Sequence, residues 1–323
     1  MSEIYLVFVV FLFVLAVFDL MVGVSNDAVN FLNSAIGAKV AKFRTIIIVA
    51  AVGVFMGATM SNGMMEVARN GVFHPAMFSL KELMFIFLAV IISDVILLDI
   101  FNNLGLPTST TVSLVFELLG GTTAFVLLKL ANDTTGLTVG DLMNTEKALG
   151  MIMAIFVSVA MAFFFGIVMQ YISRLVFTFT YKKNLKWKIG IFGGVATTAI
   201  FYFMLFKGIK SMSFVTPEIY EYIQNHTLAI LGICFLASTA IMQFLYFLKV
   251  NVFKILVLMG TFALAMAFAG NDLVNFIGVP LAGYSAFTDF AASGASDPST
   301  FMMSSLEGPA KSPMIFLVAA GAV

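Results

Sequence analysis

Charged residues are scarce in this sequence, which has 17 Lys and Arg and 17 Asp and Glu among its 323 residues, or 11% in all. A soluble domain carries about 25% charged residues, so an ordinary water-exposed surface is excluded. The formal net charge is zero, and we therefore expect no nucleic-acid partner. The single cysteine, Cys234, excludes a framework of intrachain disulfides.

Catalytic motifs are lacking as well. The sequence has no His-Glu-x-x-His motif and no pairing of nucleophile and base that would suit hydrolysis inside a membrane. We therefore predict that the protein is not an enzyme and that it uses no cofactor.

Hydrophobic residues make up 61% of the chain, including 36 Phe and 21 Met, and the mean hydropathy is +1.06. Apolar runs of about 20 residues recur, each long enough to cross a hydrocarbon core of about 30 Å as a helix. The runs are continuous rather than alternating, which favours helices over a barrel. We predict an all-α polytopic membrane protein with spans at Ile4–Val24, Thr45–Met65, Met84–Phe101, Thr111–Leu130, Leu149–Phe177, Ile189–Phe206, His226–Leu248 and Val252–Ala269.

Basic residues predict the orientation of these spans. The loop 182–188 holds four lysines, and the positive-inside rule places it in the cytoplasm. Counting spans from this loop puts the basic loops 39–44 and 249–254 on the same side. It puts the N-terminus outside. We expect the protein in the cell (inner) membrane.

One six-residue sequence occurs twice. Residues 26–31 read Asn-Asp-Ala-Val-Asn-Phe, and residues 271–276 read Asn-Asp-Leu-Val-Asn-Phe. A charged carboxylate at membrane depth costs at least about 2.5–3.5 kcal/mol, so Asp27 and Asp272 indicate a transport site. The predicted topology makes the two copies run in opposite directions, which is typical of the inverted repeats of secondary transporters. We therefore expect a first inverted repeat at 1–130, connecting helices and loops at 131–225, and the start of a second repeat at 226–323.

Each copy is expected to interrupt its helix. Gly23 and Ser25 precede the first Asn-Asp pair and Gly270 precedes the second, and Asn and Asp are favoured helix N-caps. A helix that begins in mid-membrane directs free N–H groups and the positive end of its dipole at its surroundings, which favours an anion. The alternative is that these Asn and Asp residues only form hydrogen bonds between packed helices.

A Ser-Thr-Thr sequence at 109–111 follows Pro107 between two apolar runs. A turn and a Ser/Thr-capped helix account for Pro107 and Ser109. They do not account for so many hydroxyls at one helix start, which suit the oxygens of a tetrahedral oxyanion. Further along this helix, Glu117 shares a face with Thr110 and Ser113. In the preceding run, Asp99 is expected near the turn at Asn103.

The two Asn-Asp motifs, the segment Pro107–Val115 and the pair Gly120-Gly121 together resemble the PiT family of inorganic phosphate transporters. The resemblance implies broken helices, a helical hairpin and uptake of inorganic phosphate by symport with sodium or protons. It nominates one central site, formed by Asn26, Asp27, Asn30, Ser109, Thr110, Thr111, Asn271, Asp272 and Asn275. A sulfate transporter of the same fold and a passive anion channel remain alternatives.

Three features of the sequence depart from the family pattern. Val24-Ser25 precede the first Asn-Asp pair where many members have Gly and then Ala or His, Val112 stands where many have His, and Val54 lies near the place of a glutamate in many relatives. Glu117 stands where the family usually has a small residue. We expect Glu117 to bind a coupling cation or proton, or else to pair with another helix.

The charge of phosphate sets a lower limit on the number of cations that must enter with it. Moving one elementary charge across 100 mV involves about 2.3 kcal/mol, so entry of a bare phosphate dianion into a negative interior is opposed. Two monovalent cations are needed for electroneutral entry. Because carboxylates repel an anion, we assign Asp27 and Asp272 to these cations, with sodium as the metal candidate.

The second Asn-Asp copy lies 245 residues after the first, and the same offset would put a second Ser-Thr-Thr sequence near residue 354, beyond Val323. We therefore expect residues 1–323 to be an incomplete transporter that binds phosphate weakly and does not transport alone. The sequence leaves open whether the chain forms a homo-oligomer.

Overall fold

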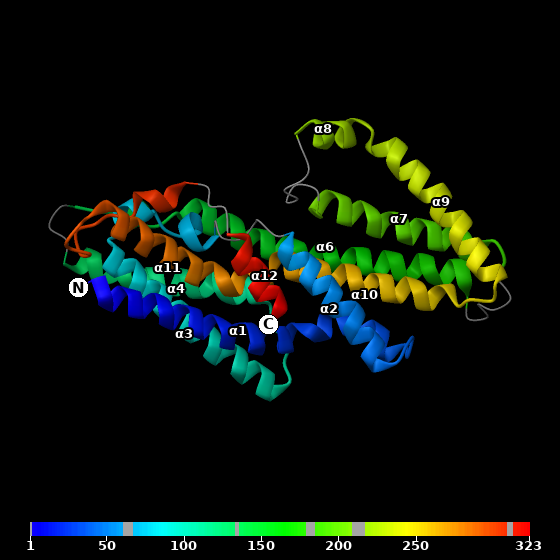
Figure 1. The fold of residues 1–323 in the computed structure, drawn as a ribbon, viewed down its shortest axis with the longest axis horizontal. Coiled ribbons are helices and arrows are strands. Elements are labelled where there is room, and N and C mark those ends of the chain that lie inside the picture. Colours follow the sequence, from blue (N-terminus) through cyan, green and yellow to red (C-terminus); the bar gives the residue numbers. More distant parts are fainter. Residues whose placement is uncertain (1, 61–66, 133–135, 179–184, 209–216, 309–312) are drawn as a thin grey trace. The chain divides into compact units, whose positions relative to one another are not determined.

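The chain was analysed as a computed structural model, which describes residues 2–60, 67–132, 136–178, 185–208, 217–308 and 313–323. The predicted all-α fold is confirmed, since the described residues form helices and two isolated β-bridges. Figure 1 shows the elements, which are α1 (Ser2–Gly37), α2 (Phe43–Thr59), η1 (Val67–Gly71), η2 (Pro75–Met77), α3 (Leu80–Leu104), α4 (Thr110–Ala131), α5 (Val139–Leu142), α6 (Thr145–Phe177), α7 (Lys188–Gly208), α8 (Pro217–Asn225), α9 (Thr227–Phe247), α10 (Val252–Asn271), α11 (Leu273–Ser293), η5 (Ser304–Glu307) and α12 (Met314–Ala322).

Helices occupy the described residues of the eight predicted membrane spans, and residues 61–65 of the predicted span Thr45–Met65 lie outside the described part of the chain. Among the described residues, six segments are long and apolar enough to cross a bilayer, namely Glu3–Gly37, Leu80–Leu104, Thr110–Ala131, Thr145–Phe177, Thr227–Phe247 and Val252–Ser293. The apolar helices α2 and α7 are shorter. The chain is thus an integral membrane protein. Lys182 and Lys183 of the predicted cytoplasmic loop lie outside the described residues, and the orientation in the membrane stays a prediction.

The predicted break at the first Asn-Asp copy is wrong, because α1 runs without interruption from Ser2 to Gly37. A glycine such as Gly23 lowers helix stability by only about 1 kcal/mol relative to alanine. The Ser25 hydroxyl donates to the carbonyl of Met21 at 2.8 Å, so it makes its hydrogen bond inside the helix. In a membrane, an unbroken helix also satisfies every backbone polar group without water.

The predicted helix break at the second Asn-Asp copy is present, but it is limited to one residue. Asp272 separates α10 from α11 with helical backbone angles (φ −89°, ψ −36°), and its side chain does not cap α11. The helix α11 continues to Ser293 with Pro280 inside it. Packing of α11 in the core offsets the hydrogen bond that Pro280 cannot donate.

Clustering of the helices divides the chain into two compact units. Unit 1 comprises Met1–Val29, Ser61–Ile155 and Phe268–Val323, and unit 2 comprises Asn30–Met60 and Phe156–Ala267. These units follow packing, so they do not test the predicted division into repeats.

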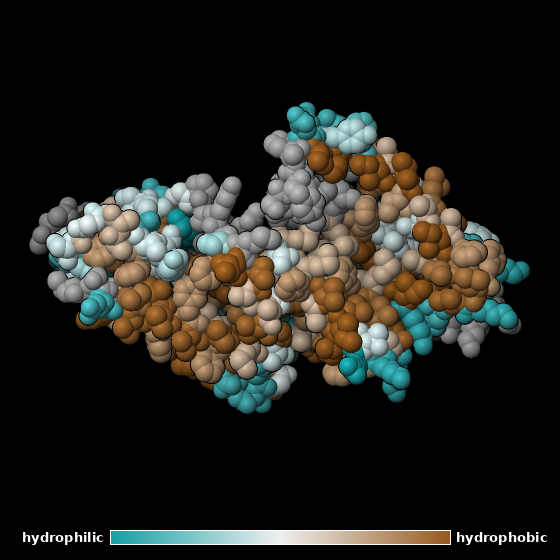
Figure 2. Space-filling model, in the orientation of Figure 1, coloured by the Kyte–Doolittle hydropathy of each residue, from teal (hydrophilic) through white to brown (hydrophobic). Residues whose placement is uncertain are grey.

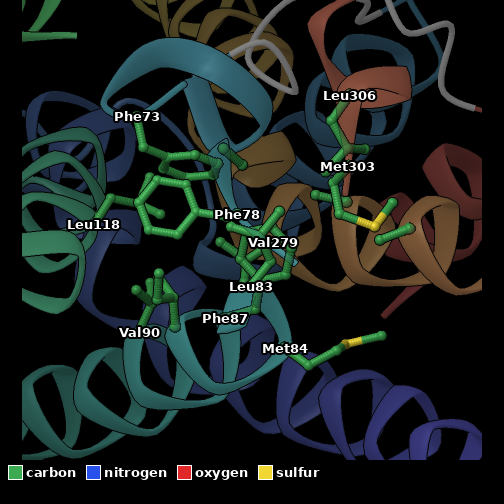
Figure 3. Close-up of a cluster of buried hydrophobic side chains, with 14 of the residues drawn as sticks. Phe73, Phe78, Leu83, Met84, Phe87, Val90, Leu118, Val279, Met303 and Leu306 are labelled. Atoms are coloured by element: carbon green, nitrogen blue, oxygen red, sulfur yellow. The ribbon is translucent and has the colours of Figure 1, made fainter. Parts of the chain in front are cut away.

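The core of unit 1 forms where α1, α3, α4 and α11 pack around the segment that carries η1 and η2. Figure 3 shows Phe73 and Phe78 of this segment against Leu83 and Phe87 of α3, with Val279 of α11 beside them. The rings of Phe73 and Phe78 meet edge to face, with centroids 5.6 Å apart. This buried apolar layer fixes the four helices relative to one another. It thereby also fixes the positions of the polar residues that they carry.

Small residues set the helix packing in unit 2. Glycines of α7 lie against α9, so that a Cβ on Gly190 would meet Gln243 and one on Gly193 would meet Met242. Such close approach is the usual way in which helices associate in a membrane, where water does not drive them together. Other side chains of this unit remain exposed, among them Phe156 and Phe163 of α6 at 67% and 72%. Figure 2 shows hydrophobic side chains over much of the visible surface, as expected of helices that contact lipid.

The two Asn-Asp copies approach each other within unit 1. A Cβ added to Gly23 of α1 would overlap the ring of Phe276 on α11. Gly23 stands three residues before Asn26, and Phe276 stands four residues after Asp272. The absence of a side chain at Gly23 therefore allows the α1 copy and the α11 copy to pack directly against each other.

We predict that Gly23→Ala destabilises the protein by about 1–3 kcal/mol, the usual effect of overpacking a buried contact. The matched control is Gly120→Ala on α4, where an added Cβ meets nothing within 4 Å. Thermal unfolding in detergent should show a lower midpoint for Gly23→Ala and an equal or higher one for Gly120→Ala. Phe276→Leu should restore part of the loss in the Gly23→Ala background. Equal midpoints for the two alanine variants would contradict the contact.

Candidate functional site

The side chain of Asn26 joins α1 to the connection between α3 and α4. Its amide nitrogen donates to the Asn102 side-chain oxygen at 3.1 Å and to the Leu106 carbonyl at 3.0 Å. Its amide oxygen accepts from the backbone N–H of Thr108 at 2.8 Å. Both amide protons are therefore engaged, so the geometry gives Asn26 a positioning role rather than free donors for a ligand.

Asn102 completes this connection from the end of α3. Its amide nitrogen donates to the Val22 carbonyl on α1 at 2.9 Å, while its oxygen accepts from Asn26. The chain then turns at Gly105, which has a φ of +66° and ends α3 in the left-handed conformation that glycine adopts without strain. The first turn of α4 is thereby held beside the Asn-Asp motif of α1. As predicted, Asp99 lies near this turn, where it accepts from the Asn103 amide at 3.2 Å.

The Ser-Thr-Thr sequence begins α4, and its three hydroxyls differ in role. The Ser109 hydroxyl caps the helix by accepting from the Val112 N–H at 3.4 Å, and Ser109 is exposed. This is the capping role that the sequence left open for it. Thr110 is 1% exposed and lies beside Asp27. A helix start with an N-cap and two threonines presents N–H groups and the positive end of a dipole.

Thr111 links α4 to the second Asn-Asp copy. Its hydroxyl donates to the Asp272 carboxylate at 2.7 Å and accepts from the Asn275 amide nitrogen at 3.0 Å. Asn275 is 3% exposed, and its amide oxygen is buried with no hydrogen-bond partner among the described residues. A buried acceptor without a donor is unfavourable, so this oxygen is suited to a bound cation or to a ligand that donates a proton.

The carboxylates of the two copies come close enough to repel each other. Asp27 is 3% exposed, and the charge of Asp272 acts on it directly. Asp272 is half-buried, and a proton or cation beside the two carboxylates would relieve the repulsion between them. This arrangement can bind a cation and can present hydroxyl and N–H donors to an anion in the same place.

Five of the predicted site residues are brought together in unit 1: Asp27, Thr110, Thr111, Asp272 and Asn275. Asn30 is exposed, and it begins unit 2, so the structure does not place it against this group. The side chain of Asn271 lies outside the described part of the chain. The assignment of these residues to substrate and cation remains a prediction.

Glu117 lies on the α4 face that carries Thr110 and Ser113, as predicted, and the carboxyl of Asp94 acts on it. The Ser113 hydroxyl donates to Asp94 at 2.9 Å. A third carboxyl, Asp19 of α1, joins them and is 1% exposed. Sequence reasoning did not single out Asp19, although a carboxylate inside an apolar span was a sufficient signal.

Arg69 of η1 is a second residue that sequence reasoning missed. Its guanidinium donates to the Ser285 hydroxyl at 3.0 Å and to the Ser305 carbonyl at 3.1 Å, and the residue is 6% exposed. It fastens η1 to α11 and η5. No periodicity surrounds this short segment, so its contacts with residues more than 200 positions later could not be read from the sequence.

No curated protein matches the chain significantly. A solved structure described as "The sodium-dependent phosphate transporter" is similar to it with a TM-score of 0.70 and 20% identity, over 98% of this chain and 73% of that chain. At that identity the likeness establishes the fold. The phosphate transporter family matches residues 23–323, which contain both Asn-Asp copies and the Ser-Thr-Thr sequence, and the predicted resemblance is thereby confirmed. The chain belongs to the phosphate transporter family.

Proposed function

We propose that this protein takes up inorganic phosphate by symport with sodium ions or protons, at the site where the two Asn-Asp copies meet the start of α4. The observation that carries the proposal is the Thr111 hydroxyl, which bonds both Asp272 and Asn275 at one end of a helix dipole. Cation ligands and anion donors are thus adjacent, as symport of an anion requires. The sodium dependence in the name of the similar structure supports cation coupling.

Each side chain takes a role that fits its chemistry. Removing phosphate from water is feasible only if fixed donors replace its hydration. The N–H groups at the start of α4 and the hydroxyl of Thr110 supply donors, and the cap formed by Ser109 keeps that start in place. The Thr111 hydroxyl donates to Asp272 and accepts from Asn275, so it orients these two side chains. Asp27 and Asp272 bind the coupling cations, whose charge offsets that of phosphate. Asn26 holds α1 against α4 rather than contacting the anion.

The Asn275 amide oxygen favours phosphate over sulfate. It is a buried acceptor with no hydrogen-bond partner among the described residues, and a protonated phosphate oxygen can donate to it. Sulfate is fully ionised near neutrality and cannot donate. A ligand that lacks the matching donor leaves this acceptor unpaired, so it binds much more weakly than a ligand that can donate to it.

Transport follows from an inverted-repeat arrangement of the two copies in the cell membrane, with the N-terminus outside. Rocking of one repeat against the other around the fixed site exposes it to each side in turn. A carrier of this kind accumulates phosphate against its gradient, whereas a passive channel does not. Uphill uptake by the full-length protein in vesicles with an imposed cation gradient distinguishes the two, since uptake that persists without the gradient would indicate a channel.

We predict that Asp272→Asn abolishes cation-driven phosphate uptake. The asparagine oxygen can still accept from Thr111, so the change removes charge rather than the hydrogen bond. Radiolabelled phosphate uptake into vesicles is measured under a sodium gradient and, separately, under a proton gradient. The control Asp99→Asn on α3 changes an exposed carboxyl and should retain uptake. Uptake by Asp272→Asn at the control level under either gradient would refute the cation assignment.

We predict that Thr111→Val raises the half-saturation concentration for phosphate about fivefold, which corresponds to about 1 kcal/mol, the usual net value of a hydrogen bond. Valine keeps the shape but removes the hydroxyl that orients Asp272 and Asn275. Thr123→Val on the same helix is the control, because that hydroxyl donates to the Leu119 carbonyl within α4. An unchanged half-saturation concentration for Thr111→Val would argue against its place in the site.

We predict that arsenate competes with phosphate and that sulfate does not. Arsenate matches phosphate in shape and retains a proton near neutral pH, so it can donate to the Asn275 oxygen. Sulfate is similar in size but has no proton to donate. Competition is measured as inhibition of phosphate uptake at equal concentrations of the two anions. Equal inhibition by sulfate would favour the alternative of a general oxyanion or sulfate carrier.

A further inference from the structure

Three buried carboxyls from three helices meet in unit 1, on the side of α4 that carries Ser113. They are Asp19 of α1, Asp94 of α3 and Glu117 of α4, and Asp94 interacts with both of the others. Asp19 is 1% exposed and Asp94 is 5% exposed. Carboxyls are rarely buried in a membrane protein without a function, because insertion of each one is unfavourable.

Hydrogen donors for these carboxyls are too few. Ser113 supplies one hydroxyl, which donates to Asp94 at 2.9 Å. Oδ1 of Asp19 and both carboxyl oxygens of Glu117 are buried with no hydrogen-bond partner among the described residues. A carboxylate accepts hydrogen bonds and cannot donate one. The contacts of Asp94 with Asp19 and Glu117 become hydrogen bonds only when one carboxyl of each pair carries a proton.

Neighbouring charges do not supply the missing compensation. The leading electrostatic partners of the three carboxyls are one another, from α1, α3 and α4, and in the described part of the chain these partners include no lysine, arginine or histidine. From α10 and α11, which carry the second Asn-Asp copy, Asp272 acts on Asp27, and Asp94 acts on Asp27 as well. Three ionised carboxylates in this setting would repel one another strongly.

We propose that Asp19, Asp94 and Glu117 form a proton-binding cluster that carries the coupling proton of the transport cycle. A proton from external water bonds to one carboxylate oxygen, is shared between carboxyls through Asp94, and leaves to internal water when that O–H bond breaks. No other bond changes. The inference rests on the proposed function, because phosphate uptake is what the proton drives.

The cluster is connected to the phosphate site through two routes. Thr110, Ser113 and Glu117 follow one another on one face of α4, and Thr110 lies beside Asp27. The charge of Asp94 acts on Asp27 directly. Protonation of the cluster therefore lowers the negative potential at Asp27, which favours approach of phosphate to the neighbouring donors. The binding of the proton and the binding of the anion are therefore coupled electrostatically, although the two ligands occupy different places.

Transport by the full-length protein in vesicles provides the first test. Accumulation of labelled phosphate is driven by an inward proton gradient in sodium-free buffer, and phosphate exchange is measured separately at equal pH on both sides. For Asp19→Asn and Glu117→Gln we expect the ratio of proton-driven accumulation to exchange to fall, with loss of its dependence on external pH. Asp99→Asn, an exposed carboxyl on α3, should keep the wild-type ratio. An unchanged ratio in both cluster variants, or accumulation by the wild type under sodium alone, overturns the proposal.

Infrared spectroscopy provides a second test that does not depend on transport. The carbonyl band of a protonated carboxylic acid shifts when water is replaced by heavy water, and it disappears as pH rises. We expect such a band in the wild type and in Asp99→Asn, and its loss or weakening in Asp19→Asn and Glu117→Gln. An identical band in all four proteins overturns the cluster even if phosphate is transported. Absence of phosphate exchange in the wild type would refute the proposed function, and the infrared band would still decide whether the cluster binds a proton.

Discussion

The side-chain amide of Asn26 is the interaction on which the site depends. Through one acceptor and two donors it joins α1 to Asn102, Leu106 and Thr108, and so fixes where α4 begins. Without this connection, the first turn of α4 would not be held beside the Asn-Asp sequence of α1. Both amide protons and the amide oxygen of Asn26 have protein partners, so this buried side chain ties α1 to the start of α4.

Electrostatic balance is the second constraint on unit 1. Five carboxyls occupy its polar interior, and the basic residue that the structure describes there, Arg69, instead fastens η1 to α11 and η5. Asp27 lies beside the hydroxyl of Thr110, and Asp272 accepts from the hydroxyl of Thr111. In the cluster, Asp94 faces two other acids. Charge compensation must therefore come from mobile ions, and this requirement makes the binding of anion and cation interdependent.

Hydropathy was sufficient to predict the spans, because in a membrane the backbone has few alternatives to a helix. The motif residues were also found, since the repeat of Asn-Asp at two matching positions marks them directly. The backbone at these positions was not predictable. Ser25 bonds back within α1, and α11 continues through Pro280 because tertiary packing supports it. Partnerships between distant residues, such as that of Asp19 with Glu117, leave no periodic signal.

Two nearly identical sequences thus adopt different backbones. At Asn26 every peptide group takes part in a continuous helix, whereas at Asp272 the helix is interrupted by a single residue without a side-chain cap. The hydrogen bonds of α1 are continuous through the first copy, whereas the second copy lies where two helices adjoin. A change of backbone angles at Asp272 would alter its hydrogen bond to Thr111, and no equivalent change is available within α1. The two Asn-Asp copies are thus similar in sequence but differ in backbone structure.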